Sequence, residues 1–94
     1  MRKYELVLIF SPKSREEKRK KVIGEIEKII KKGKGKVEKV TPWGKKKFAY
    51  LIEKEKEGWY YLILFSTEVE NLSQIEKELK LKEEILRFLI IRRG

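Results

Sequence analysis

Gly58-Trp59-Tyr60-Tyr61-Leu62-Ile63-Leu64-Phe65 is the stretch that decides the fold, because every position after its glycine is aromatic or aliphatic. Such an unbroken apolar run is typical of a strand that is covered on both faces. The stretches Tyr4–Phe10 and Phe88–Ile91 have nearly the same character. We therefore expect these three strands in one sheet, and something must cover each face of its centre.

The composition limits the class of protein. We expect one domain over residues 1–94, with a single modest core. The absence of Cys and His removes disulfides, thiol sites, the commonest metal ligand and the commonest general base, so we expect no enzyme, metal, cofactor or small-molecule substrate. A net charge of +10 predicts an anionic partner. No apolar run could span a bilayer and no signal-peptide pattern is present, which predicts a cytoplasmic protein that does not contact membranes.

Two helices are predicted, each opened by a capping box. The first box is Ser14–Glu17, with a helix to about Lys32, and the second is Thr67–Glu70, with a helix to about Lys80. Apolar residues recur at spacings of three and four along both helices, so each has one stripe toward the sheet. The stripes are Val22, Ile23, Ile26, Ile29 and Ile30, then Val69, Leu72, Ile75 and Leu79. We expect Ile26 and Ile75 to be buried together with Phe88.

The second strand begins at Lys36 and contains Pro42. Proline cannot donate to a strand ladder, so this strand is predicted to be an edge or to bulge there. It resumes to Ile52, and Glu53–Gly58 is expected to be a charged hairpin loop. The last strand is predicted from about Ile85 to Arg92.

The order is therefore strand-helix-strand-strand-helix-strand. With right-handed crossovers, this order predicts an α+β, ferredoxin-like βαββαβ fold. Such a fold has a four-stranded antiparallel sheet with two helices on one face, and its first and third strands are central. The apolar character of those two strands agrees with that position.

Two helices cover only one face of the sheet. We expect the helix-facing side chains to be Leu6, Leu8, Phe10, Tyr61, Ile63, Phe65, Phe88 and Ile90. The opposite parity then points outward, namely Val7, Ile9, Tyr60, Leu62, Leu64, Leu89 and Ile91. An apolar patch of this size exceeds what a monomer normally exposes, which predicts a protein-binding surface. The alternative is that sheet twist, loops and long Lys stems cover these residues.

Basic side chains gather around the second strand. Residues 31–47 hold eight Lys and one Glu, a local charge of +7. Lys45–Lys47 lies between Trp43-Gly44 and Phe48-Ala49-Tyr50, so that basic and aromatic groups alternate. This combination favours RNA, because cations meet phosphates and flat side chains meet riboses or unstacked bases. The run Lys18–Lys21 on the first helix is interpreted as a solvated face.

Several stretches together resemble bacterial small-subunit ribosomal protein six. They are Met1-Arg2-Lys3-Tyr4-Glu5, Val37-Glu38-Lys39-Val40 and Gly44-Lys45-Lys46-Lys47-Phe48-Ala49-Tyr50-Leu51-Ile52, followed by Lys54 and Gly58. The resemblance covers nearly the whole chain in order and spacing, and the stretch from Gly44 is its most characteristic part. Phe48 stands where Leu is usual, and Glu53 stands where a small or basic residue is usual. The resemblance, with the Glu- and Lys-rich composition, implies a natural thermophile member of this family or a redesign on its scaffold.

The resemblance implies a structural role in the small ribosomal subunit. Members bind the central domain of small-subunit ribosomal RNA together with small-subunit protein eighteen, as a heterodimer, during assembly. The predicted RNA contacts are Arg2, Tyr4, Lys45, Lys46, Lys47, Tyr50, Arg87, Arg92 and Arg93. The predicted contacts with the partner protein are Tyr60, Leu62, Leu64, Leu89 and Ile91. Many members carry a C-terminal tail that helps to grip the partner, and this sequence ends at Gly94 without one.

Two alternatives remain open. A generic RNA-recognition motif has the same topology, but Glu57-Gly58-Trp59-Tyr60-Tyr61 has the wrong charge and a bulky Tyr60 for its third-strand motif. A redesigned ferredoxin-like scaffold would keep the fold with weak RNA binding or none. An acylphosphatase is disfavoured because the single Asn, Asn71, falls in the second helix.

Overall fold

The computed structural model describes residues 1–93, and the predicted order of elements is confirmed. The strands are β1 (Arg2–Phe10), β2 (Lys36–Ile52), β3 (Glu55–Thr67) and β4 (Ile85–Arg93). The helices are α1 (Glu16–Lys32) and α2 (Leu72–Lys80), and the short 3₁₀ helix η1 (Val69–Asn71) precedes α2.

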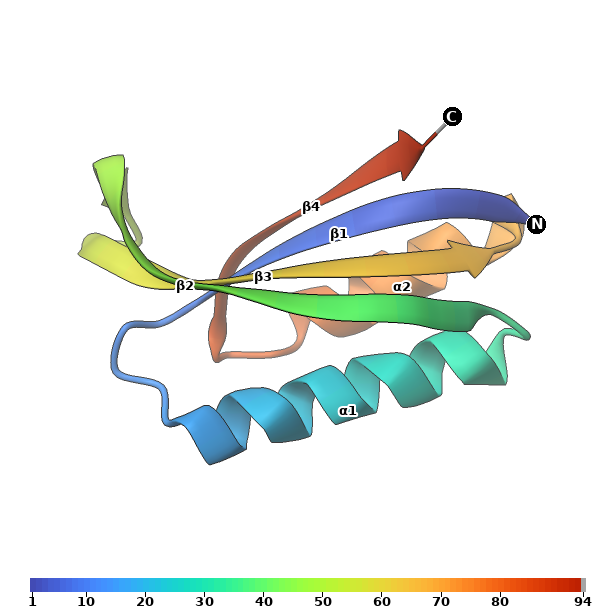
Figure 1. The fold of residues 1–94 in the computed structure, drawn as a ribbon, viewed down its shortest axis with the longest axis horizontal. Helices are drawn as coiled ribbons and strands as arrows, with labels where there is room; N and C mark the ends of the chain where they lie inside the picture. The colour runs from blue at the N-terminus through green and yellow to red at the C-terminus, as the bar shows by residue number, and fades with distance from the viewer. Residues whose placement is uncertain (94) are drawn as a thin grey trace.

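The four strands form one antiparallel sheet in the order β2-β3-β1-β4. Leu6 in β1 is paired with Ile63 in β3 on one side and with Ile90 in β4 on the other. Figure 1 shows α1 below the strands and α2 behind them, and within residues 1–93 no helix lies over the opposite side of the sheet. The expected ferredoxin-like arrangement is therefore confirmed, including the central place of β1 and β3.

The core lies between the helices and the sheet face that was expected to point at them. Leu6 and Ile63 have no exposed surface, and Ile26 and Ile75 are 1% and 2% exposed. Phe88 was expected to be buried as well, but it is only partly buried and packs against the edge of the core. The reason is its position on β4, an edge strand with a neighbour on one side only.

Both predicted capping boxes are wrong. The Ser14 hydroxyl donates to the Ser11 carbonyl oxygen at 2.5 Å, and Arg15 precedes α1 without a side-chain cap. Thr67 still belongs to β3, and its hydroxyl accepts a hydrogen bond from Asn71 at 3.3 Å. In each case the hydroxyl that was expected to cap the helix makes a hydrogen bond to another nearby residue instead.

The first helix ends where the sequence predicts, but a lysine takes the strained position after it. Lys34 has φ +64°, and the Gly35 N–H donates to the Ile30 carbonyl oxygen at 2.8 Å. These contacts are typical of a Schellman motif, which usually has glycine at the left-handed residue. Gly35 is needed for a different reason, because a Cβ there would lie 2.7 Å from the Ser66 carbonyl oxygen.

The expected loop over Glu53–Gly58 is too long. The two strands continue to a two-residue turn at Glu53 and Lys54, with φ values of +49° and +67°. Positive φ at both central residues is the signature of a type I′ hairpin turn. The resulting hairpin arm, residues 45–57, bends up and away from α1 (Figure 1).

β2 is an edge strand interrupted by three register shifts. They fall between Val37 and Lys39, between Pro42 and Gly44, and between Lys47 and Ile52. The predicted irregularity at Pro42 is confirmed. Because bulged residues leave the ladder, Glu38, Trp43 and residues 48–51 are free to make other contacts.

Candidate functional site

The sheet side opposite the helices, called the outer face below, is apolar at its centre. Leu89, Val7 and Leu62 form one cross-strand row, and the next row contains Ile91 and Leu64 on either side of Glu5. Leu89 is 56% exposed and Ile91 is 43% exposed, whereas Val7, Leu62 and Leu64 are half-buried. The expected outward parity is confirmed for these side chains.

Ile9 does not belong to the exposed part of this surface. It was expected to point outward, but it is only 8% exposed. The Phe48 ring of the hairpin arm lies 6.0 Å from the Tyr60 ring, and Phe48 and Ile9 both approach the position where Gly58 lacks a side chain. A Cβ at Gly58 would lie 2.9 Å from Ile9 and from Phe48. The base of the arm therefore covers Ile9.

A polar row borders the apolar part of the outer face at the end of the sheet nearest the N-terminus. Arg93 pairs in register with Lys3, whose other neighbour is Ser66. The Arg93 guanidinium lies 2.6 Å from the Glu38 carboxylate, to which Ser66 also donates at 3.2 Å. The hydrogen bond from Arg93 lowers the pKa of Glu38 below its usual value. Arg93 was expected to be an RNA contact, but it is already paired within the chain.

Other basic side chains stay available at the same end of the sheet. Arg2 and Arg92 are exposed, and together with Met1, Lys3 and Arg93 they line a hollow of about 320 Å³. Tyr4 was also expected to contact RNA here. It is only 2% exposed and stacks on Phe65 at 5.5 Å, so the structure makes it a core residue and corrects that expectation.

The three lysines of the arm do not share one surface. Lys46 is paired with Gly58 on the outer face, whereas Lys45 is paired with Trp59 on the helix side. Lys45 lies 3.6 Å from Glu57 and 5.5 Å from the Trp59 ring centre. The bulge that follows presents Tyr50 with 85% of its surface exposed.

The predicted RNA contacts are thus divided between two ends of the sheet. Along β3, nine residue steps separate Gly58, beside the arm lysines, from Thr67, which pairs with Arg2. At about 3.4 Å per residue this is roughly 30 Å. Arg87 is paired with Ile9 and lies nearer the arm. The apolar rows of the outer face lie between the two basic ends.

Arg19 is buried, although the run Lys18–Lys21 was expected to be a solvated face. It is 4% exposed, and its Nε donates to the Tyr61 hydroxyl at 3.0 Å. Its guanidinium lies 4.1 Å from the Trp59 ring centre and donates to the Ser14 carbonyl oxygen. The signal was present, because position 19 continues the apolar stripe of α1 at the helical spacing. Arg19 therefore links α1 to Trp59 and Tyr61 of β3, next to the hairpin arm.

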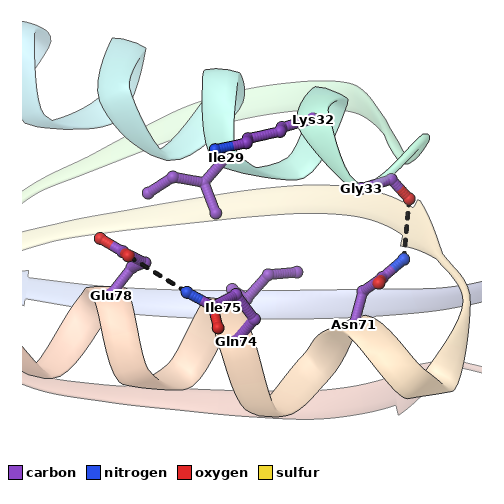
Figure 2. Close-up of a pocket in the computed structure, with 7 residues that line it drawn as sticks. All are labelled: Ile29, Lys32, Gly33, Asn71, Gln74, Ile75 and Glu78. Carbon is purple, nitrogen blue, oxygen red and sulfur yellow. Dashed lines mark hydrogen bonds between the residues drawn. The ribbon is translucent and has the colours of Figure 1, made fainter.

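The groove between the helices has a structural explanation. It has a volume of about 420 Å³ and lies between α1 and α2 (Figure 2). Asn71 donates to the Gly33 carbonyl oxygen at 2.7 Å, and Gln74 donates to Glu78 at 3.2 Å. The first hydrogen bond joins the end of α1 to η1, just before α2, and the second lies within α2, so these polar groups are satisfied within the chain.

Neither metal chemistry nor membrane insertion is indicated within residues 1–93. No group of three acidic side chains there is arranged to hold a metal ion. None of the helices in that range has the length and apolar character needed to cross a membrane. The outer face and its two basic ends are therefore the features from which a function can be argued.

Comparisons with known proteins give one consistent result. Residues 3–92 match the family described as Ribosomal protein S6. The chain is 39% identical to small ribosomal subunit protein bS6 of Thermoanaerobacter pseudethanolicus, over 98% of this chain and 97% of that protein. It is 30% identical to the protein of the same name from Fusobacterium nucleatum, over 98% of each chain. The crystal structure of 30S ribosomal protein S6 from Thermotoga maritima superposes with a TM-score of 0.91 at 39% identity, over 98% of this chain and 87% of that one.

Proposed function

Because the chain belongs to the ribosomal protein S6 family of the small ribosomal subunit, we propose that it binds the central domain of small-subunit ribosomal RNA together with small-subunit protein eighteen. The family consists of structural ribosomal proteins and not of enzymes. The chain is accordingly a part of the ribosome, and we place that ribosome in the cytoplasm. The heterodimer is proposed to form during assembly of the subunit.

The observation that carries this proposal is the apolar outer face between two basic ends. Tyr60, Leu62, Leu64, Leu89 and Ile91 are the residues proposed to contact protein eighteen, and Leu89 and Ile91 are 56% and 43% exposed. A partner laid on these side chains would remove them from water. It would leave the basic groups at both ends of the sheet free for RNA.

The proposed RNA contacts are the exposed cations at those two ends, together with Tyr50 of the arm. They are Arg2 and Arg92 near the N-terminus, and Lys45, Lys46, Lys47, Tyr50 and Arg87 toward the arm. Tyr50 is suited to stacking on an unpaired base, because it lies outside the strand ladder and is 85% exposed. Arg93 has a weaker claim, because Glu38 already neutralises it.

Binding to a central-domain RNA fragment, measured with and without protein eighteen, tests the proposal. We expect tight binding only when both proteins are present. An affinity that is the same with and without the partner would favour a generic RNA-binding module instead. No binding in either case would favour a scaffold that has kept the fold and lost the site.

The salt dependence of that binding tests the arm. Each neutralised phosphate adds roughly 0.7 to 0.9 to the slope of log affinity against log salt concentration. Replacing Lys45, Lys46 and Lys47 with Gln should reduce the slope by about two. The matched control replaces three lysines of α1, Lys18, Lys20 and Lys21, with Gln as well. These lysines are exposed on the helix side of the sheet. Equal effects of both triple variants would contradict a specific role of the arm.

A further inference from the structure

Glu5 is a charged residue at the centre of the apolar outer face. Its cross-strand neighbours are Leu64 in β3 and Ile91 in β4, and Val7 follows it on the same side of β1. Tyr4 on the opposite side is in the core, so the Glu5 side chain must point outward. It is half-buried in the free chain.

The carboxylate of Glu5 has no basic partner among residues 1–93. No Lys, Arg or N-terminal nitrogen in that range lies within 4.0 Å of its oxygens. The nearest cations by register are Lys3 and Arg93, in the adjoining row. Arg93 is turned to Glu38 instead, at 2.6 Å.

A protein that covers Leu64 and Ile91 must also cover Glu5, which lies between them. Removing an unpaired carboxylate from water is strongly unfavourable unless an opposite charge and hydrogen bonds replace the water. We propose that the protein bound on the outer face presents an Arg or Lys side chain to Glu5. This inference rests on the proposed heterodimer and adds the chemistry of the partner at one position.

The net charge of the chain favours a cation, and not a neutral or apolar group, as the part of the partner protein that meets Glu5. At +10 the chain would repel another basic, RNA-binding protein unless acidic groups lie where the two surfaces meet. Glu5 supplies such a group inside the contact area. The aliphatic side chains beside Glu5, namely Leu64 and Ile91 in its own row and the Leu89-Val7-Leu62 row next to it, would by themselves permit several registers of binding. One charge pair among them selects a single register, which makes Glu5 a specificity-determining residue.

Titration of purified protein eighteen into Glu5→Gln and Glu5→Leu variants tests the proposal. Both variants should fold, because Glu5 makes no ion pair in the free chain. Both should bind at least about 30-fold more weakly, since each leaves the partner's cation buried and unpaired. Glu17→Gln is the matched control. It makes the same change of charge on an exposed position of α1 and should leave binding unchanged.

The Glu5→Leu variant distinguishes a charge pair between Glu5 and the partner from a purely apolar contact at this position. If the partner offers only apolar surface to Glu5, then Glu5→Leu will bind more tightly than the parent chain, and the proposal is overturned. Tighter binding by Glu5→Gln would also overturn it, because it would mean that the carboxyl group is protonated in the complex. If the parent chain itself does not bind protein eighteen, the proposed function fails and this inference fails with it.

Discussion

Leu62 and Ile63 are adjacent residues of β3 that point to opposite faces of the sheet. Ile63 has no exposed surface and packs in the core, whereas Leu62 is half-buried on the outer face between Val7 and Thr41. The variants Leu62→Glu and Ile63→Glu therefore place the same charge on the two faces at nearly the same point of the chain. Their comparison separates the stability of the fold from binding on the outer face.

The expected costs differ because the two side chains lose different amounts of burial. Fully burying a Leu or Ile side chain contributes about 1.5–3 kcal/mol. Leu62 is already partly in water, so Leu62→Glu should lower the free energy of unfolding by about 1 kcal/mol. Ile63→Glu loses the full contribution and also buries an unpaired carboxylate, so its cost should be about 4 kcal/mol or more. That is a large part of the roughly 5–15 kcal/mol that stabilises a typical domain.

Urea unfolding followed by circular dichroism measures the first effect, and titration with protein eighteen measures the second. We expect Leu62→Glu to fold and to bind the partner at least about 30-fold more weakly, because its charge would be buried at the interface. If Leu62→Glu unfolded as readily as Ile63→Glu, the assignment of the two faces would be wrong. If it folded and bound normally, the outer face could not be the partner interface.

Three further substitutions test individual contacts. Tyr4→Phe removes a buried hydroxyl that has no hydrogen-bond partner, so urea unfolding should show equal stability or a gain of up to about 1 kcal/mol, with unchanged RNA affinity. Lys54→Gly relieves a positive φ in the hairpin turn and should raise the free energy of unfolding by roughly 0.5–1 kcal/mol, whereas a loss would contradict the turn geometry. Arg93→Gln should destabilise the chain near neutral pH, because Arg93 lowers the pKa of Glu38. That contribution is present above the usual carboxyl pKa of 4.5 and is lost as the pH falls through the lowered value, so the two chains should converge in acid.

The sequence by itself determined the order of the elements, the central strands and which residues of a strand share a face of the sheet. These follow from local periodicity, since alternate residues of a strand share a face and residues three or four apart share a helix stripe. That Leu62 and Ile63 point to opposite faces was predictable on this basis, but only the structure showed that Ile63 is the one that faces the helices. Alternation also places Glu5 outward, but only the register showed that Leu64 and Ile91 lie on either side of it.

Only the tertiary structure decided which basic and aromatic groups are free. Tyr4 lies in the core and Arg93 is paired with Glu38, although both were expected to contact RNA. Arg19 lies on Trp59 inside what was expected to be a solvated run. These outcomes depend on contacts between residues far apart in the chain, and the pairing of Arg93 also depends on the bulge of β2 that takes Glu38 out of the ladder. Local pattern places Arg19 on the buried stripe of α1, but it does not show which groups a side chain meets, because such contacts are set by how separate elements pack together.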